Sequence, residues 1–417
     1  LFDMRFAQEA HIAGGYVATL NPMVTDAFIE TTYEAYKREV GEEFGKTVPG
    51  IFTDEPSYRA HSLWQTTYKL PWTGQLPDVF QAERGYDLMP HLPALFFAVA
   101  GAEKVRLDFY RTVSDLFVES YTKPLYNWCE ANGIQFTGHY LLEVPFRMAT
   151  RVAGSVMHHY EYMHCPGVDH LGAEIGSRTN PWPTIQMRQL ASVGRQLGKK
   201  RLMDEIFGCG GYNLTPARQR QMVDWQSALG INWVVPHAFY YSHEGLRKRE
   251  YPPDDFYAMP WWPQSRKFWD YIRRISYVFA EGHRLADVLV IHPMESIWAT
   301  QRDQFVTSDK DPDSWIEAKF IELENALNAA FIDHDYGEEE LLSRHAKATY
   351  DGLKVGNATY KYVIVPPCLT LRESTITLLR NFVNEGGKLI CLEPVPYLVD
   401  GVPDDNLRQK LRPTRVL

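Results

Sequence analysis

Short apolar runs alternate with longer amphipathic stretches over the first 283 residues. Six of these runs have the length and near-continuous apolar character of buried parallel strands, and they lie at residues 15–20, 49–54, 134–140, 167–171, 201–207 and 231–239. Between them, apolar positions recur at helical spacing, most clearly over residues 25–40, 103–132 and 215–229. This alternation predicts an α/β fold in which helices cover a parallel sheet.

The number of units and their polar ends favour a closed (β/α)₈ TIM barrel over residues 1–283. Active-site residues of such barrels gather at the C-terminal ends of the strands, and several of these runs end in carboxylates. A complete barrel has eight strands, so we expect the six to be strands three to eight, with N-terminal strands missing from this chain. The chain opens on Leu1, which also suggests a fragment or a processed product.

The pattern changes near residue 283. Three β runs then alternate with two helices, at residues 286–291, 314–329, 360–365, 374–383 and 388–392. This β–α–β–α–β order predicts a separate open α/β domain over residues 284–417. Gly386-Gly387 precedes a strand, so we interpret it as the end of a helix rather than a phosphate-binding loop.

Composition narrows the class of protein. The 417 residues include 52 acidic and 43 basic side chains, a net charge of −9 that argues against a nucleic-acid-binding protein. No apolar run approaches the ~18 residues of a membrane span. Five scattered cysteines form no CxxC pair, which disfavours both a disulfide framework and a cysteine zinc site. The sequence favours a cytoplasmic location. The location stays open, because a signal peptide would be lost together with a missing N-terminus.

Two apolar runs lead into adjacent carboxylates. One ends in Asp54 and Glu55, which Pro56 follows, and the other contains Asp204 and Glu205. Adjacent strand residues point to opposite sides, so one carboxylate of each pair is expected to enter the barrel mouth. Carboxylates at the ends of barrel strands are well placed for acid–base chemistry.

Histidines and aromatic residues follow the same or neighbouring strands. Such groups orient polar ligands through hydroxyls, and aromatic rings stack on the C–H faces of sugars. With the strand-end carboxylates, they predict a carbohydrate site whose binding residues are Asp54, His139, Tyr140, Glu143, Asp204, His237, Tyr240, Trp64 and Trp261.

A second group of polar residues lies between His158 and Cys165. His158, His159, Glu161 and His164 invite a metal hypothesis, but their spacing matches neither HExxH nor CxxC. We therefore expect no metal and no other cofactor. A metal-dependent hydrolase built on His158, His159 and Glu161 is the alternative.

With the strands numbered three to eight, Glu55 follows strand four and Glu205 ends strand seven. This arrangement resembles the clan A glycoside hydrolases, in particular β-galactosidases of families 42 and 35. The resemblance implies Glu55 as acid/base and Glu205 as nucleophile of a retaining two-glutamate hydrolysis, with a carbohydrate substrate. It also implies that the C-terminal segment is a flavodoxin- or amidotransferase-like domain, which suggests a homo-oligomer.

Two departures from that pattern point to a divergent or unclassified family. Asp54 replaces the usual Asn, so it accepts hydrogen bonds and raises the pKa of a neighbouring acid. The cysteine zinc cluster of many family 42 enzymes is also absent. An inverting barrel similar to α-L-rhamnosidases, which that resemblance would pair with calcium, is one alternative, and a catalytically inactive carbohydrate-binding barrel is another.

Overall fold

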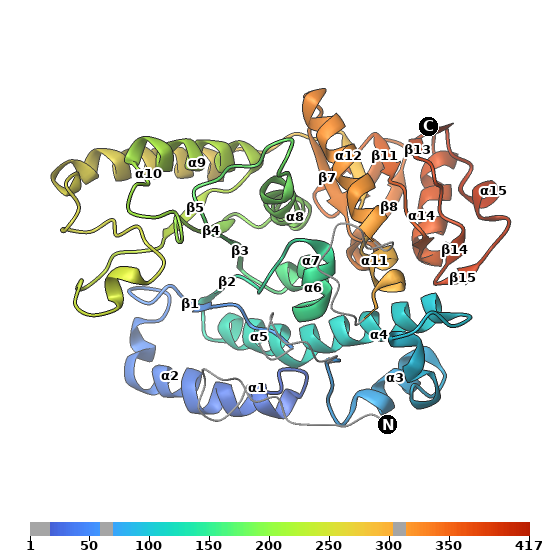
Figure 1. Ribbon diagram of the computed structural model, residues 1–417, viewed down its shortest axis with the longest axis horizontal. Coiled ribbons are helices and arrows are strands. Elements are labelled where there is room, and N and C mark those ends of the chain that lie inside the picture. Colours follow the sequence, from blue (N-terminus) through green and yellow to red (C-terminus); the bar gives the residue numbers. More distant parts are fainter. Residues whose placement is uncertain (1–16, 59–69, 303–313) are drawn as a thin grey trace.

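A sheet of five parallel strands forms the first part of the molecule (Figure 1). The computed structural model describes residues 17–58, 70–302 and 314–417. In order across the sheet, the strands are β1 (Gly50–Thr53), β2 (Gln135–Gly138), β3 (Cys165–His170), β4 (Met203–Ile206) and β5 (Trp233–Pro236). Within the described residues the sheet stays open at β1 and β5, so it is a half-barrel rather than a closed barrel.

These strands coincide with five of the six that the sequence pattern predicts here. The prediction of a strand at residues 15–20 is wrong for its described part, because residues 17–20 form coil and a turn. Thr19 Oγ1 donates to the Ser57 carbonyl, and the Asn21 side chain accepts from the Met23 amide. Asn21 thereby caps α1 (Pro22–Phe28), and the chain enters a helix directly instead of a strand.

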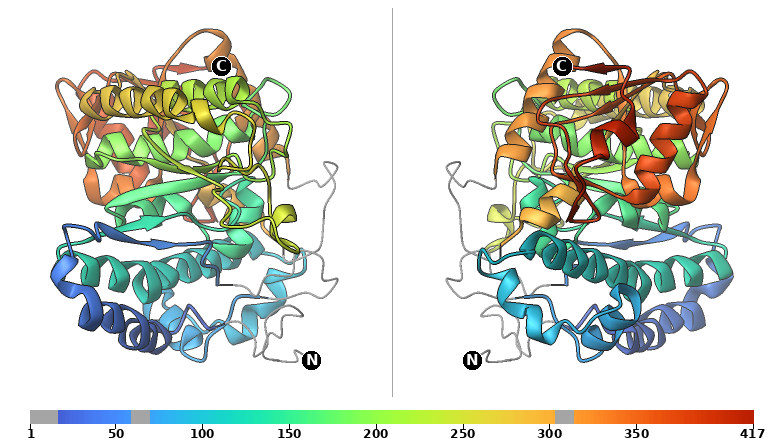
Figure 2. Two further views of the ribbon diagram at one scale, coloured as in Figure 1. Left: turned by 90° about the vertical axis from the view of Figure 1, so that its left-hand side faces the viewer. Right: turned by 90° about the vertical axis from the view of Figure 1, so that its right-hand side faces the viewer.

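Helices cover the strand layer on both sides (Figure 2). Two long helices, each interrupted by a π turn, cover one side. The first consists of α1, η1 (Ile29–Tyr33) and α2 (Glu34–Val40). The second consists of α4 (Ala102–Phe117), η4 (Val118–Thr122) and α5 (Lys123–Ala131). On the other side lie α8 (Trp182–Leu197), α9 (Pro216–Leu229) and α10 (Ser265–Glu281). The shorter helices are α3 (Leu76–Arg84), α6 (Phe146–Val152) and α7 (Val156–Glu161).

A second parallel sheet follows α10. Its strands are β16 (Arg415–Val416), β13 (Lys388–Cys391), β11 (Tyr362–Val365), β6 (Val288–Ile291) and β7 (His334–Gly337), in that spatial order. Renumbered along the chain, the order is 2-1-3-4-5, the arrangement of flavodoxin-like sheets. Its helices are α11 (Met294–Thr300), α12 (Trp315–Ala329), α13 (Glu339–His345), α14 (Glu373–Asn384) and α15 (Leu407–Leu411).

Two small three-stranded sheets accompany the second sheet. One is an antiparallel meander of β8 (Ala346–Thr349), β9 (Gly352–Val355) and β10 (Ala358–Tyr360). The other joins β12 (Thr370–Leu371), β14 (Leu398–Val399) and β15 (Val402–Pro403). No helix among the described residues is both long and apolar enough to span a bilayer.

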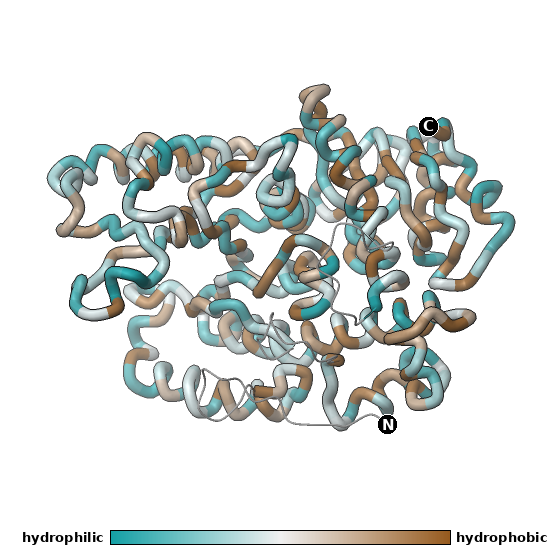
Figure 3. The backbone as a smooth tube through the Cα atoms, in the orientation of Figure 1, coloured by the Kyte–Doolittle hydropathy of each residue, from teal (hydrophilic) through white to brown (hydrophobic). Residues whose placement is uncertain are grey.

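One hydrophobic core crosses the predicted boundary at residue 283. Its buried members include Phe136 and Leu190 of the first part together with Trp298, Phe320 and Tyr336 of the second. The peripheral helices alternate apolar and polar residues along their length, visible as brown and teal in Figure 3. One core cluster thus joins the two sheets, a second lies wholly within the C-terminal part, and the division into residues 1–283 and 284–417 stays a prediction.

A buried charge cluster also joins the two parts. Glu324 on α12 accepts hydrogen bonds from Arg188 Nε (3.1 Å), His334 Nε2 (2.7 Å) and Tyr336 Oη (2.7 Å). Although burial alone would raise it, the pKa of Glu324 is lowered well below its usual value by His334 and Arg188. The carboxylate is therefore ionised in the folded protein and bonded on several sides.

Replacing Glu324 with Gln is expected to lower the free energy of unfolding at pH 7 by about 1–3 kcal/mol, because hydrogen bonds to a buried charge are lost. A lowered folded-state pKa contributes stability above the unfolded value of ~4.3, and that contribution disappears as the pH falls. The difference between wild type and variant should therefore shrink from pH 7 to pH 3 in urea unfolding followed by tryptophan fluorescence.

Glu322→Gln on the same helix is the matched control, because its exposed carboxylate contacts only Lys319 among the ion pairs of the described residues. Its free energy of unfolding should stay within about 0.5 kcal/mol of the wild type. Equal stability of Glu324→Gln and wild type at pH 7 would show that the buried cluster does not hold the two parts together.

Candidate active site

Glu55 stands just past the C-terminal end of β1. Its backbone has a φ of 47°, in the left-handed region, and its side chain is half-buried. The neighbouring Asp54 is more exposed: 73% of its side chain is accessible, and its Oδ1 lies 3.9 Å from His139 Nε2. Both carboxylates thus lie beyond the end of β1, and they differ in exposure although each approaches His139.

His139 follows β2 and lies at the centre of the site. β1 and β2 pair with Thr53 opposite Gly138, and the His139 amide donates to the Thr53 carbonyl (3.2 Å). A Cβ on Gly138 would lie 1.9 Å from that carbonyl oxygen, so the close approach requires glycine. The imidazole is 1% exposed, and its Nε2 lies 2.8 Å from Glu205 Oε2.

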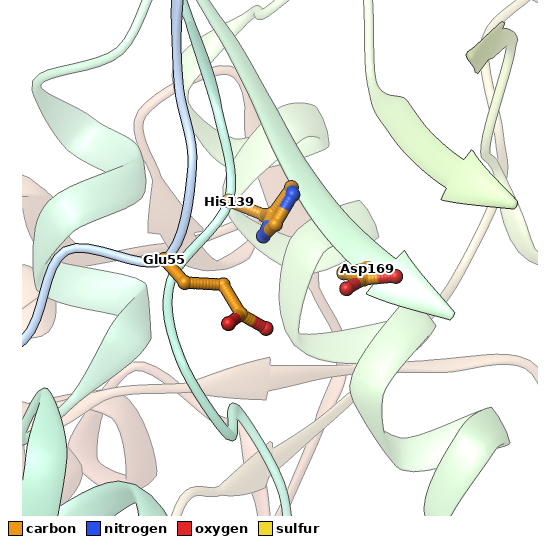
Figure 4. A group of neighbouring side chains, drawn as sticks. All are labelled: Glu55, His139 and Asp169. Carbon is orange, nitrogen blue, oxygen red and sulfur yellow. The ribbon is translucent and has the colours of Figure 1, made fainter. Parts of the chain in front are cut away.

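Asp169 completes the group from β3. It pairs in register with Glu205 on β4, so both side chains leave the sheet in the same direction. One potential ligand atom each from Glu55, His139 and Asp169 lies within 4.8 Å of the others (Figure 4). Asp169 is not among the site residues predicted from the sequence, although it is a single carboxylate near the end of the apolar run at residues 167–171.

The charges of this group shift its pKa values in opposite directions. Burial alone would raise the pKa of Glu205, but the hydrogen bond from His139 and the charges of His139 and His237 lower it. Burial would lower the pKa of His139, yet Glu205, Glu143 and Asp169 raise it to about 9. Burial and the charges of neighbouring carboxylates raise the pKa of Asp169 to about 7. The cluster thus contains an ionised Glu205 beside groups that keep a proton near neutral pH.

Three predicted site residues serve the interior rather than an open site. Asp204 is fully buried and accepts from the His170 amide (3.1 Å) and from Gln226 Nε2, because its side chain leaves β4 on the side opposite to Glu205. Tyr140 is also fully buried, and its hydroxyl lies 2.6 Å from Thr122 Oγ1. Glu143 is buried against Gln186 Nε2 (2.9 Å), although its charge reaches His139. The prediction that Asp204 and Tyr140 face a ligand therefore does not agree with their placement.

The remaining candidates lie after β5. His237 is close enough to Glu205 to lower its pKa. Tyr240 instead ties its own loop together, because its amide donates to Asp254 Oδ1 (3.1 Å). Trp261 is half-buried and lines a small cavity of about 70 Å³ with Asp255 and others. Trp64 lies outside the described residues.

The residues between His158 and Cys165 do not converge. His158 Nε2 lies 2.8 Å from Glu338 Oε1, and His159 Nδ1 lies 2.7 Å from Thr122 Oγ1. Glu161 contacts His345, and His164 contacts Glu130. Each side chain thus has a separate structural partner, which gives the alternative metal-dependent hydrolase no common site here.

Cys209 is also a poor nucleophile. It is exposed in the loop after β4, and slight burial together with the charge of Asp169 raises the pKa of its thiol. A raised pKa leaves less thiolate at neutral pH, and the thiolate is the reactive form.

A cavity of about 1060 Å³ lies at the other end of the first sheet. Its lining includes Gln135 and Trp233, which begin β2 and β5, together with the face of α10 that carries Trp269. Catalytic groups of α/β barrels gather at the opposite, C-terminal ends of the strands. The cavity is therefore distinct from the carboxylate–histidine cluster, which is the candidate active site.

Glu55, His139 and Asp169 also form a donor set that fits a divalent cation. Within the described residues, His139 Nδ1 and Asp169 Oδ1 are buried atoms without a hydrogen-bond partner. With a pKa of about 9, His139 carries a proton on both ring nitrogens near neutral pH, so a cation would bind at Nδ1 only after that proton is lost, while Nε2 still donates to Glu205. A ligating histidine commonly donates its other N–H to a carboxylate in this way.

The half-barrel carries acidic residues at or just past the ends of β1, β3 and β4, where α/β barrels place groups for acid–base chemistry. Residues 8–406 match the model of glycoside hydrolase family 106, described as α-L-rhamnosidase. The chain belongs to this family. The family differs from the β-galactosidase families 42 and 35 that the two motifs suggest on their own.

Comparisons with known proteins agree on this class. A curated relative, a putative β-glucuronidase of Formosa agariphila, is 25% identical over 396 residues, which is 91% of this chain and 30% of that protein. The rhamnosidase of Novosphingobium sp. PP1Y superposes with a TM-score of 0.68 at 16% identity, over 95% of this chain and 36% of that one. A cold-adapted β-galactosidase of Rahnella sp. R3 gives 0.65 at 12% identity, over 95% and 58%. The chain thus spans about a third of the first two relatives.

Proposed function

We propose that the protein hydrolyses α-L-rhamnosides and that Glu55 and Glu205 are its two catalytic carboxylates. The observation that carries the proposal is the placement of His139, which contacts Glu205 at 2.8 Å and approaches Glu55 at the ends of adjacent strands. The sugar comes from the family match, and the roles come from the position of each acid on the sheet.

The proposed reaction is an inverting displacement. Glu205, ionised because of His139, removes a proton from water as the water oxygen attacks the anomeric carbon. The bond from that carbon to the leaving oxygen breaks, and Glu55 gives its proton to the leaving oxygen. Inversion replaces the retaining mechanism expected from the β-galactosidase resemblance, because the family match favours the rhamnosidase alternative.

The direct test is hydrolysis of 4-nitrophenyl glycosides. The α-L-rhamnopyranoside should release nitrophenol, and the β-D-galactopyranoside should be inert or far slower. Release from the galactoside alone would contradict the proposal.

A β-glucuronidase is the second candidate, because the curated relative carries that putative name. The substrate of such an enzyme bears a carboxylate on the ring that is cleaved. Asp54, Glu55, Asp169 and Glu205 would repel that carboxylate at the candidate site. The 4-nitrophenyl β-D-glucuronide should therefore be inert, and its preferred hydrolysis would favour the second candidate.

As an alternative to the acid role of Glu55, we propose that Glu55, His139 and Asp169 would hold a divalent cation, in which case Glu55 is ionised and is not the proton donor. Such an ion would supply a fixed positive charge that orients the hydroxyls of a bound sugar. Two carboxylates suit calcium better than softer metals. Whether the protein forms a homo-oligomer stays a prediction.

Asp169→Asn is expected to weaken calcium binding at least about tenfold, because one anionic ligand becomes neutral. Isothermal titration of calcium into wild type and variant measures the change. Glu174→Gln, an exposed carboxylate on the loop after β3, is the control and should bind as the wild type does. Equal binding by Asp169→Asn and wild type would remove Asp169 from the donor set.

A further inference from the structure

Three consecutive cations project from the loop that follows β5. Arg247, Lys248 and Arg249 form the short 3₁₀ turn η5 (Arg247–Arg249), and all three are exposed. We refer to these three residues as the basic turn. In the ion pairs of the described residues, Arg247 approaches Glu244 at 3.9 Å, and none involves Lys248 or Arg249. This concentration of positive charge stands out in a chain with a net charge of −9.

The basic turn is anchored by two tyrosines. Tyr212 Oη, from the loop after β4, donates to the Lys248 carbonyl (2.6 Å), and Tyr240 Oη donates to the Glu250 carbonyl. The Cys209 amide donates to the Tyr251 carbonyl (3.3 Å). Bonds on both sides of Arg249 therefore fix the backbone that presents the cations.

The same contacts place the basic turn at the rim of the candidate active site. The loop that contributes Tyr212 and Cys209 begins directly after β4, which carries Glu205. Tyr251, two residues after Arg249, has its ring centroid 6.0 Å from that of His237. The His237 amide in turn donates to the carbonyl of Ile206 (2.9 Å), the residue that follows Glu205.

The basic turn therefore adds positive charge at the rim of a site whose centre contains three carboxyl groups. The carboxylates around Glu55, Asp169 and Glu205 disfavour an anionic group on the sugar that is cleaved. The basic turn attracts such a group at a position further out, because exposed guanidinium and ammonium groups pair with carboxylates and sulfates.

We propose that the basic turn binds a carboxylate or sulfate group of the glycan substrate, outside the sugar that is cleaved. The inference rests on the proposed function, because it assigns the glycan to the same site. The substrate class is then an acidic glycan that carries a neutral sugar at the point of cleavage.

The test is binding to defined polymers by affinity electrophoresis. The probes are polygalacturonate, which carries carboxylates, ι-carrageenan, which carries sulfates, and neutral galactan. The variant Arg247→Gln/Lys248→Gln/Arg249→Gln should lose at least about tenfold in affinity for one or both acidic polymers, since three charge contacts are removed. Binding should also weaken with salt in the wild type. A loss of affinity for polygalacturonate identifies the bound group as a carboxylate, and a loss for ι-carrageenan identifies it as a sulfate.

A matched control uses the cations at the opposite end of the sheet. Lys200→Gln/Arg266→Gln/Arg273→Gln removes the same charge from the lining of the large cavity and should bind the acidic polymers as the wild type does. Three outcomes would overturn the proposal: the wild type binds neither acidic polymer, the basic-turn variant binds them as tightly as the wild type does, or the control loses as much affinity as the basic-turn variant.

Activity separates this inference from the proposed function. The basic-turn variant should hydrolyse 4-nitrophenyl α-L-rhamnoside at the wild-type rate, because that substrate carries no anionic group. If the basic-turn variant loses polymer binding but the wild type does not cleave the rhamnoside, the anion site is supported and the proposed function is refuted. A folded variant that loses nitrophenyl activity to the same extent as polymer affinity would overturn the assignment to an outer position.

Discussion

Glu205→Gln is expected to lower kcat on 4-nitrophenyl α-L-rhamnoside by about 10²–10⁴-fold, because the variant cannot take a proton from water. The substitution changes shape very little, and the amide oxygen can still accept from His139 Nε2. Glu205 is also partly exposed, at 17% of its side chain. Thermal unfolding should therefore stay within a few degrees of wild type.

The control for this variant is Glu174→Gln. Glu174 is an exposed carboxylate on the loop after β3, at the same end of the sheet, and it contacts Asn180 at 3.3 Å. Its kcat should stay within about twofold of wild type. A Glu205→Gln enzyme with more than a tenth of wild-type kcat would remove Glu205 from the base role.

Glu55→Gln is expected to lose more activity on substrates whose leaving group must be protonated than on substrates whose leaving group departs as an anion. On a rhamnoside with an alkyl leaving group, kcat/KM should fall by about 10²–10⁴-fold, the usual contribution of a general acid. On the 4-nitrophenyl substrate the loss should be far smaller, because nitrophenolate leaves readily without protonation. Steady-state rates on both substrates measure the difference.

Asp54→Asn is the informative companion of Glu55→Gln. Asp54 is its chain neighbour but is 73% exposed, so its loss should affect both substrates to a similar extent. If Glu55→Gln also reduces both substrates equally, Glu55 is not the proton donor. An equal and small effect of both variants would move the acid role to Asp169.

The parts of the fold that sequence patterns predict well are those with strong apolar continuity. The run at residues 49–54 places Glu55 at a strand end, and the run at residues 201–207 places Glu205 at another. Both depend on local signals, namely a short apolar run and an acidic end. The pairing of these strands through β2 and β3 follows from their order in the chain.

The parts that the pattern misses depend on partners far away in the sequence. β7 has the sequence His-Asp-Tyr-Gly and is fully buried, because His334 and Tyr336 bond to Glu324 on a preceding helix. Tyr140 follows a strand as a rim residue would, yet it stacks on His159 with ring centroids 4.0 Å apart. Single-sequence reasoning does not provide such long-range contacts.

The configuration of the first product tests the central claim most directly. Proton NMR can follow hydrolysis of 4-nitrophenyl α-L-rhamnopyranoside before the released sugar mutarotates. An inverting α-L-rhamnosidase that uses Glu205 as base should release β-L-rhamnose first, with the α-anomer appearing only later. Release of α-L-rhamnose first would make Glu205 a nucleophile, and no release of rhamnose would contradict the proposed substrate.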